Sequence, residues 1–189
     1  MLDYILSKDI ELLIFLNNLG TTQWDGFWLI ITNKFSAIPL YLFLLYYTYI
    51  NYGLKKTLSV ILFVALLITI SDQTSNLFKY GFKRLRPCHD EYVLHLIRLV
   101  KESCGGMYAY FSAHAANAFA IAVFFGLILK QQLKFILPLL IIWAFLTGYS
   151  RIYIGVHFPL DVLTGIFFGT LYGIIIYKLW KWFLLKFMN

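Results

Sequence analysis

An arginine, a histidine and an aspartate stand close together in the segment 150–161, between two long apolar runs of the sequence. They are Arg151, His157 and Asp161. An arginine offers a planar fork of N–H donors that fits phosphate, and a histidine followed by a nearby carboxylate is typical of a nucleophile and the group that orients it. Charges beside hydrocarbon are rare unless they serve a function. The segment therefore predicts chemistry on an anionic substrate; a membrane-surface loop with incidental charges is the alternative.

The composition predicts a membrane protein. Of the 189 residues, 61% are hydrophobic and 20% aromatic, whereas only 13% are charged. A soluble domain cannot bury so much apolar surface, so we expect one polytopic, all-α domain over 1–189. The net charge of +7 does not indicate nucleic acid, because most basic residues lie at the ends of apolar runs, where they set topology and meet lipid headgroups.

The apolar runs predict a membrane bundle of about six helices. Residues 1–34 contain an amphipathic helix over 3–19 and a helix over 26–32 that is too short to span a bilayer. Whether 24–34 continues into the first span stays open. The spans are expected at 35–52 and 57–80, then, after one long extramembrane connection over 81–111 with a short helix at 91–101, at 112–129, 135–150 and 160–182.

The ends of these spans bring separate polar groups to one side of the membrane. Lys79 ends one span there, Ser112 and His114 begin the next, and a later span returns there with its arginine. Asp72 and Asn76 share a helix face with Lys79, because the three follow i, i+4, i+7 spacing. We expect that face to point into the bundle or a wet cavity, where the two residues either support a site or make structural hydrogen bonds.

Along the chain the polar clusters read Lys79-x6-Arg86-Pro87, Ser112-Ala113-His114 and Ser150-Arg151-x5-His157-x3-Asp161. They resemble the three signature motifs of the type 2 phosphatidic acid phosphatase superfamily, in its integral-membrane bacterial branch. The resemblance covers 57–182. The family's middle motif is usually Pro-Ser-Gly-His, whereas this chain has Phe111 and Ala113 in place of the proline and glycine. We expect Ala113 to present its N–H to phosphate from the first helical turn, with somewhat different contacts.

The resemblance implies a lipid phosphatase that needs neither metal nor cofactor. It implies that His157 attacks phosphorus to form a phosphohistidine, that Asp161 orients its ring, and that His114 protonates the departing oxygen and then activates water. The sequence also offers no carboxylate cluster for a metal. The implied phosphate-binding groups are Lys79, Arg86, Ser112, Ala113 and Arg151.

The distribution of basic residues favours a site that faces away from the cytoplasm, on the periplasmic side of the inner membrane. The face opposite the site carries seven cations, whereas the site face carries five once the phosphate-binding ones are set aside. In an oxidising compartment, a disulfide between Cys88 and Cys104 outranks a metal site, and two free thiols are the alternative. Such a bridge would stabilise the fold by about 3 kcal/mol.

A site at the bilayer surface predicts a substrate with a lipid tail and a terminal phosphate or diphosphate. Phosphatidylglycerol phosphate, phosphatidic acid, undecaprenyl diphosphate and lipid A phosphates all fit. One alternative is a dedicated undecaprenyl-diphosphate phosphatase. Another is a non-catalytic protein that binds or transports lipid headgroups. That protein would need the cations, but it would have no reason to place His157 four residues before Asp161.

Overall fold

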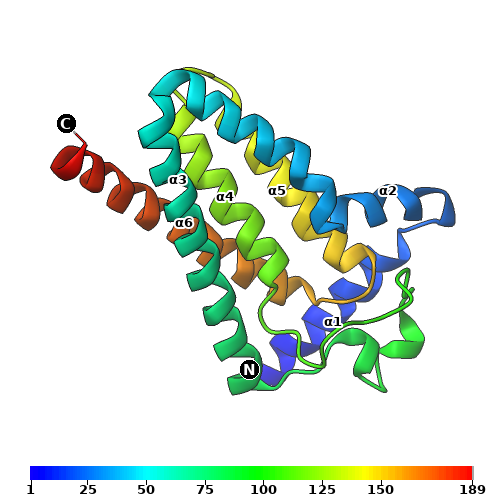
Figure 1. Cartoon of the computed structure of the whole chain (residues 1–189). Coiled ribbons are helices and arrows are strands. Elements are labelled where there is room, and N and C mark those ends of the chain that lie inside the picture. Colours follow the sequence, from blue (N-terminus) through cyan, green and yellow to red (C-terminus); the bar gives the residue numbers. More distant parts are fainter. Residues whose placement is uncertain (189) are drawn as a thin grey trace.

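The computed structural model describes residues 1–188, which form a bundle of α-helices with three short 3-10 helices (Figure 1). No strand of a sheet occurs within this part of the chain. The predicted all-α bundle of about six helices is confirmed. The elements are α1 Leu2–Asn18, α2 Thr22–Thr32, η1 Lys34–Ala37, α3 Ile38–Phe82, η2 Pro87–His89, η3 Leu94–Leu96, α4 Ala113–Leu129, α5 Ile136–Tyr153 and α6 Pro159–Phe187.

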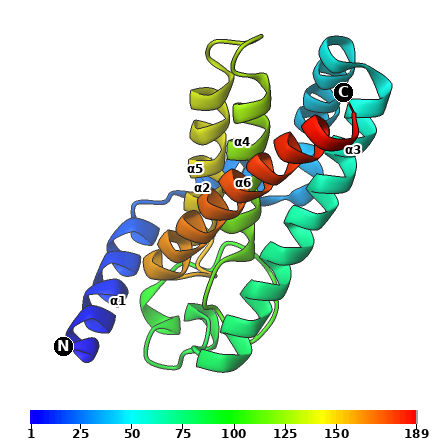
Figure 2. The ribbon, with the colours of Figure 1, turned by 90° about the vertical axis from the view of Figure 1, so that its left-hand side faces the viewer.

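Helix α3 consists of two legs that run in opposite directions (Figure 1). Gly53 separates them with φ 76° and ψ 172°, a conformation that glycine adopts easily because it has no Cβ. This turn agrees with the predicted break between two spans. It lies at the same end of the bundle as the connection between α4 and α5, while α1 and the long connection between α3 and α4 lie at the other end (Figures 1 and 2).

Helix α4 is the centre of the bundle. From Ala118 onward it is apolar on all sides, and 13 of its 17 residues are buried against α3, α5 and α6. Around it, the segments 34–82, Ile136–Tyr153 and Pro159–Phe187 are long and apolar enough to cross a membrane. Because this part of α4 is enclosed by other helices, it needs no polar face.

The close approach of α4 and α6 depends on small residues. A Cβ on Gly169 would overlap the carbonyl oxygen of Ala116, so no larger residue fits without moving a helix. At the start of the same pair, the Ser112 N–H donates to the Asp161 carbonyl over 3.0 Å. The packing of these two helices therefore fixes the relative position of the second and third polar clusters.

The N-terminal helix α1 packs against the bundle through one stripe. Leu13 and Asn17 are fully buried in it. The Asn17 side-chain amide donates to the carbonyls of Ile152 (3.1 Å) and Tyr153 (2.7 Å). It thereby adds a partner for the last carbonyls of α5, of which that of Ile152 also accepts from the Gly155 N–H. Helix α2 is separate from α3, since Asn33 is extended and η1 follows, so 24–34 does not continue into the first span.

The predicted short helix over 91–101 is wrong in extent, because only η3, Leu94–Leu96, forms there. The Arg98 N–H donates to the Asn17 side-chain oxygen over 2.6 Å. The Val100 N–H donates to the Ile154 carbonyl over 3.4 Å. These backbone donors bond to α1 and to the end of α5, so they are not available for a local helix.

Gly169→Ala should destabilise the protein by about 1–3 kcal/mol, because the new methyl group would collide with the α4 backbone. The melting temperature in detergent measures this effect. Gly26→Ala is the matched control: Gly26 lies in α2 with open space where the methyl group would go, so its replacement should leave stability unchanged or slightly raised. Equal melting temperatures for the two variants would contradict the close-packing account.

Candidate active site

The structure brings the three polar clusters to one end of the bundle. Lys79 lies in the last turn of the second α3 leg, Arg86 directly before η2, and Arg151 in the last turn of α5. The charges of all three act on both His114 and His157. The two histidines therefore lie in the field of the same three cations.

His157 lies in the turn between α5 and α6 and is only 1% exposed. Its Nδ1 faces the Asp161 Oδ2 at 3.4 Å, the outer limit of a hydrogen bond. The same oxygen accepts from the Phe158 N–H over 2.9 Å, so the carboxylate both caps α6 and faces the imidazole. This arrangement favours the proton on Nδ1 and leaves the Nε2 lone pair for a reaction.

Burial lowers the pKa of His157 well below its ordinary value, and the charges of Arg151 and Arg86 lower it further. The imidazole is therefore neutral at neutral pH, which a nucleophile requires. Gly155 forms the turn that places His157, with φ 78°. A Cβ there would lie 2.7 Å from the Arg98 carbonyl oxygen.

Arg86 is held by the long connection. Residues 84–86 pair with 107–109 in an antiparallel manner around a bridge between Leu85 and Tyr108. The Arg86 Nη1 donates to the Cys104 carbonyl over 2.6 Å, and its Nε donates to the Tyr108 carbonyl over 3.3 Å. Cys88 and Cys104 are joined by a disulfide with a Cα separation of 6.1 Å, so the bridge adjoins this arginine. Loop carbonyls thus fix one edge of the guanidinium.

Arg151 is 5% exposed, and its Nη1 donates to the Thr32 hydroxyl of α2. Its Nε is buried without a hydrogen-bond partner in residues 1–188. An unpaired buried guanidinium N–H costs free energy unless an anion completes it. Arg151 is therefore suited to bind an oxygen of a phosphate group.

Ser112 and Ala113 play different structural parts at the start of α4. Ser112 is fully buried and is the N-cap, since its hydroxyl accepts from the Ala115 N–H at 3.5 Å. Ala113 and His114 line a cavity of about 290 Å³ between α3, α4 and α5. Because the first N–H groups of a helix have no helical acceptor, this wall can bind an anion.

Asp72 lies in the wall of this cavity, but Asn76 does not. Asn76 is exposed on the outer face of α3, beside Gln73 and Leu77 in a groove away from the cavity, so its predicted place in the cavity is wrong. Successive residues turn by 100° around a helix. With Ser75 fully buried, the residue after it is rotated toward the outside.

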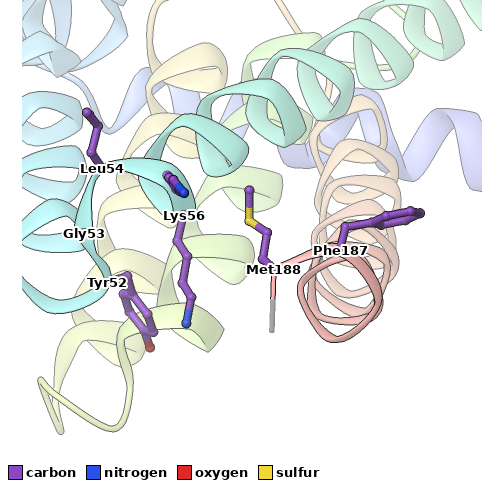
Figure 3. Close-up of a pocket in the computed structure, with 7 residues that line it drawn as sticks. Tyr52, Gly53, Leu54, Lys56, Phe187 and Met188 are labelled. Atoms are coloured by element: carbon purple, nitrogen blue, oxygen red, sulfur yellow. The ribbon is translucent and has the colours of Figure 1, made fainter.

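The other pockets described here for residues 1–188 are lined by no residue of the three clusters. An apolar groove of about 520 Å³ adjoins the cavity and shares Ile31, Ala37 and Trp143 with it. A further pocket lies between the Gly53 turn and the C-terminal end of α6, where Lys56 and Phe187 line it (Figure 3). That pocket is lined by no residue of the three clusters, which lie at the opposite end of the bundle.

Sequence reasoning missed two residues that support the site, Arg84 and Asp9. In the sequence, Arg84 is only one of several cations that set topology, and Asp9 lies near Lys8 on a polar helix face. The Arg84 guanidinium donates to the Asp161 Oδ1 (3.1 Å) and the Asp9 Oδ2 (2.6 Å). The Asp9 Oδ1 accepts from the Leu160 N–H over 2.8 Å. A buried ionic chain therefore leads from α1 to the carboxylate that faces His157.

Two patterns in the sequence, taken together, could have indicated Arg84 and Asp9. Arg84 and Arg86 are two apart in an extended segment, so their side chains lie on the same side. Asp9, Leu13 and Asn17 follow i, i+4, i+8 spacing, which makes a single buried stripe on α1. The aspartate at the end of a buried stripe needs a cationic partner.

The family model for the PAP2 superfamily matches residues 56–184. The chain belongs to the PAP2 superfamily. A lipid A 4′-phosphatase of Bacteroides thetaiotaomicron is 33% identical over 179 residues, which cover 94% of this chain and 79% of that protein. A second lipid A 4′-phosphatase, from Porphyromonas gingivalis, is 32% identical and covers 95% of this chain and 75% of its own. These PAP2 relatives confirm the prediction of an enzyme of the membrane lipid phosphatase class.

An undecaprenyl-diphosphatase of Sulfolobus acidocaldarius is 32% identical over 116 residues, or 61% of this chain and 53% of that protein. Among solved structures, the LpxE of Aquifex aeolicus has a TM-score of 0.67 at 30% identity, and the match covers 89% of this chain and 93% of that one. The PAP2-type phosphatidylglycerolphosphate phosphatase of Bacillus subtilis has a TM-score of 0.72 at 23% identity, over 97% and 88% of the two chains, and shows the same fold.

Arg84→Lys should lower kcat for a lipid phosphate about tenfold or more while KM changes less than twofold. Lysine keeps the charge but cannot bridge Asp9 and Asp161 with two parallel donors, so the carboxylate that faces His157 is less well fixed. Steady-state phosphate release at several substrate concentrations measures both constants. Lys83→Met is the control, because Lys83 is the exposed neighbouring cation and should leave both constants unchanged. A rise in KM with kcat unaltered would contradict a positioning role.

Cys88→Ser/Cys104→Ser should weaken substrate binding and lower stability by about 3 kcal/mol, because the bridge closes the connection whose carbonyls hold Arg86. The melting temperature and KM of the purified protein measure the two effects. Dithiothreitol should produce the same changes in the wild type and none in the double variant. A wild type that is insensitive to the reductant, with its thiols open to alkylation beforehand, would show that the disulfide is not formed.

Proposed function

We propose that this PAP2 protein removes the 4′-phosphate of lipid A. The share of the chain that each relative matches is the strongest support for this function. The two lipid A 4′-phosphatases match 94% and 95% of the chain, whereas the undecaprenyl-diphosphatase matches 61%. The superfamily model begins only at residue 56, so the lipid A relatives also share much of the segment 1–55. That segment includes α2 and η1, which line the cavity next to His114.

Lys79, Arg86 and Arg151 would hold the phosphate group, together with the first N–H groups of α4. The two guanidinium groups can each contact two oxygens, and Lys79 adds a point charge. All three cations act on both histidines, so the phosphorus atom would lie between His114 and His157. Negative charge that develops on the non-bridging oxygens is stabilised there without any rearrangement of the protein.

The reaction would proceed in two displacements. The Nε2 of His157 attacks phosphorus, the bond from phosphorus to the sugar oxygen breaks, and His114 donates a proton to that oxygen. The products of this step are a free sugar hydroxyl and a phosphohistidine. His114, now neutral, takes a proton from water; the resulting hydroxide attacks phosphorus and releases inorganic phosphate and neutral His157. Asp161 keeps the Nδ1 proton of His157 in place throughout.

We further propose that the site faces the periplasm. The positive-inside bias supports this orientation, since seven cations lie on the face opposite the site against five on its own face. The pairing of Cys88 with Cys104 beside Arg86 also supports it, because structural disulfides persist in oxidising compartments.

The test is phosphate release by the purified protein from lipid A that carries phosphates at both the 1 and 4′ positions. Wild type should yield lipid A that keeps only its 1-phosphate, as shown by fragmentation in a mass spectrometer. His157→Ala should lower the rate at least about a thousandfold, since the nucleophile is lost. His95→Ala removes an exposed histidine of the long connection and should be as active as wild type. Loss of the 1-phosphate, or cleavage of undecaprenyl diphosphate alone, would overturn the assignment.

A further inference from the structure

Two polar residues in the active-site cavity have no part in the two displacements. Asp72 on α3 and Asn117 on α4 face each other, and the Asn117 Nδ2 donates to the Asp72 Oδ1 over 2.9 Å. Both line the cavity that His114 also lines. The side-chain oxygen of Asn117 is buried and has no hydrogen-bond partner within the described part of the chain. A buried acceptor of this kind is costly unless a ligand completes it.

The position of the pair relative to His114 determines what would contact it. His114 and Asn117 are three residues apart and share one face of α4, with Asn117 one turn deeper in the bundle. In the proposed reaction, His114 protonates the oxygen that leaves phosphorus. The alcohol attached to that oxygen then lies along the cavity beside Asn117 and Asp72.

An apolar part of the cavity lies beyond this pair. Ile68, Ile121 and Trp143 line that part, and the adjoining groove continues the apolar surface, while Thr32, Asn33, Lys34 and Thr147 add polar groups to the lining. Along α4, His114 comes first, then Asn117 and then Ile121, so the polar pair lies between the proposed acid and an apolar wall. A substrate that matches this order has a phosphate, a polar group with hydrogen-bond donors, and acyl chains.

Asp72 and Asn117 together favour a ligand group that donates hydrogen bonds over one that accepts them. A carboxylate only accepts hydrogen bonds, and an asparagine whose N–H is already bonded to that carboxylate presents its carbonyl oxygen. An acylated amino sugar offers hydroxyl and amide N–H donors at this place. The leaving group of a polyprenyl diphosphate is a phosphate monoester, which has negative charge and no donor when ionised, so Asp72 would repel it.

We propose that Asp72 and Asn117 form the leaving-group site of the enzyme, which binds the donors of an acylated sugar and disfavours a diphosphate. The proposal rests on the function proposed above and names the part of the substrate that decides specificity. Such a site raises the rate for one class of lipid and lowers it for another, whereas a merely structural pair would affect both classes alike.

The experiment compares kcat/KM for lipid A and for undecaprenyl diphosphate in the same detergent. Asn117→Leu should lower kcat/KM for lipid A about fivefold and leave the value for undecaprenyl diphosphate nearly unchanged, because only the sugar uses the acceptor. Asp72→Asn should raise the ratio of diphosphate to lipid A activity about tenfold, since it removes a charge and adds donors. Gln73→Leu replaces the exposed neighbouring amide on the outer face of α3 and should leave the ratio unchanged.

The outcomes separate the two proposals. A wild type that releases no phosphate from lipid A overturns the proposed function. A wild type that is active on lipid A, combined with Asn117→Leu and Asp72→Asn variants that lower both activities in parallel or leave the ratio unaltered, overturns the leaving-group site alone. Melting temperatures of the variants show which have folded, and Asp72→Asn, which is nearly isosteric, tests the proposal even where Asn117→Leu does not fold.

Discussion

The buried carboxylate of Asp161 is the interaction on which the rest of the site depends. One of its oxygens faces His157 and caps α6, and the other accepts from Arg84. Its backbone carbonyl accepts from the Ser112 N–H at the start of α4. His157, the start of the two helices α4 and α6 and the extended segment 84–86 therefore meet at one residue. A carboxylate buried this completely needs such partners to offset the cost of removing its charge from water.

Asp9 extends this junction to α1 and sets the charge balance of the site. Burial raises the pKa of Asp9, while Arg84 opposes that rise, so the guanidinium between the two carboxylates favours their ionised forms. The charged groups at this end of the bundle include four cations and three carboxylates: Lys79, Arg84, Arg86 and Arg151, with Asp9, Asp72 and Asp161. Lys34 also lines the cavity, so the cations outnumber the carboxylates and a bound phosphate would offset this excess. The site is therefore balanced for an anionic ligand without strong repulsion in its absence.

The parts of the structure that the sequence predicts are those that local rules determine. The start of a span at Ser112, the break between the first two spans and the spans themselves follow from residue type and apolar run length. Arg84 and Asp9 could not be paired from the sequence, because 75 residues separate them and only the packed bundle makes them neighbours. The helix expected over 91–101 failed for the same reason, since distant side chains and carbonyls take its hydrogen bonds. The predicted place of Asn76 failed because a stripe with this spacing still has two edges: Asp72 lies toward the cavity and Asn76 on the outer edge, and spacing alone does not tell which edge faces inward.

The groups proposed to bind phosphate and the rest of the cavity lining come from different parts of the sequence. The groups proposed to act on phosphate all lie within 56–184, the range of the PAP2 model. The segment before it supplies Thr32, which fixes Arg151, and Ile31 and Ala37, which the cavity and its apolar groove share. His114 lines the same cavity as this segment. Because the lipid A relatives share nearly the whole chain, the N-terminal elements are the part in which acyl-chain preference can change while the phosphate chemistry stays the same.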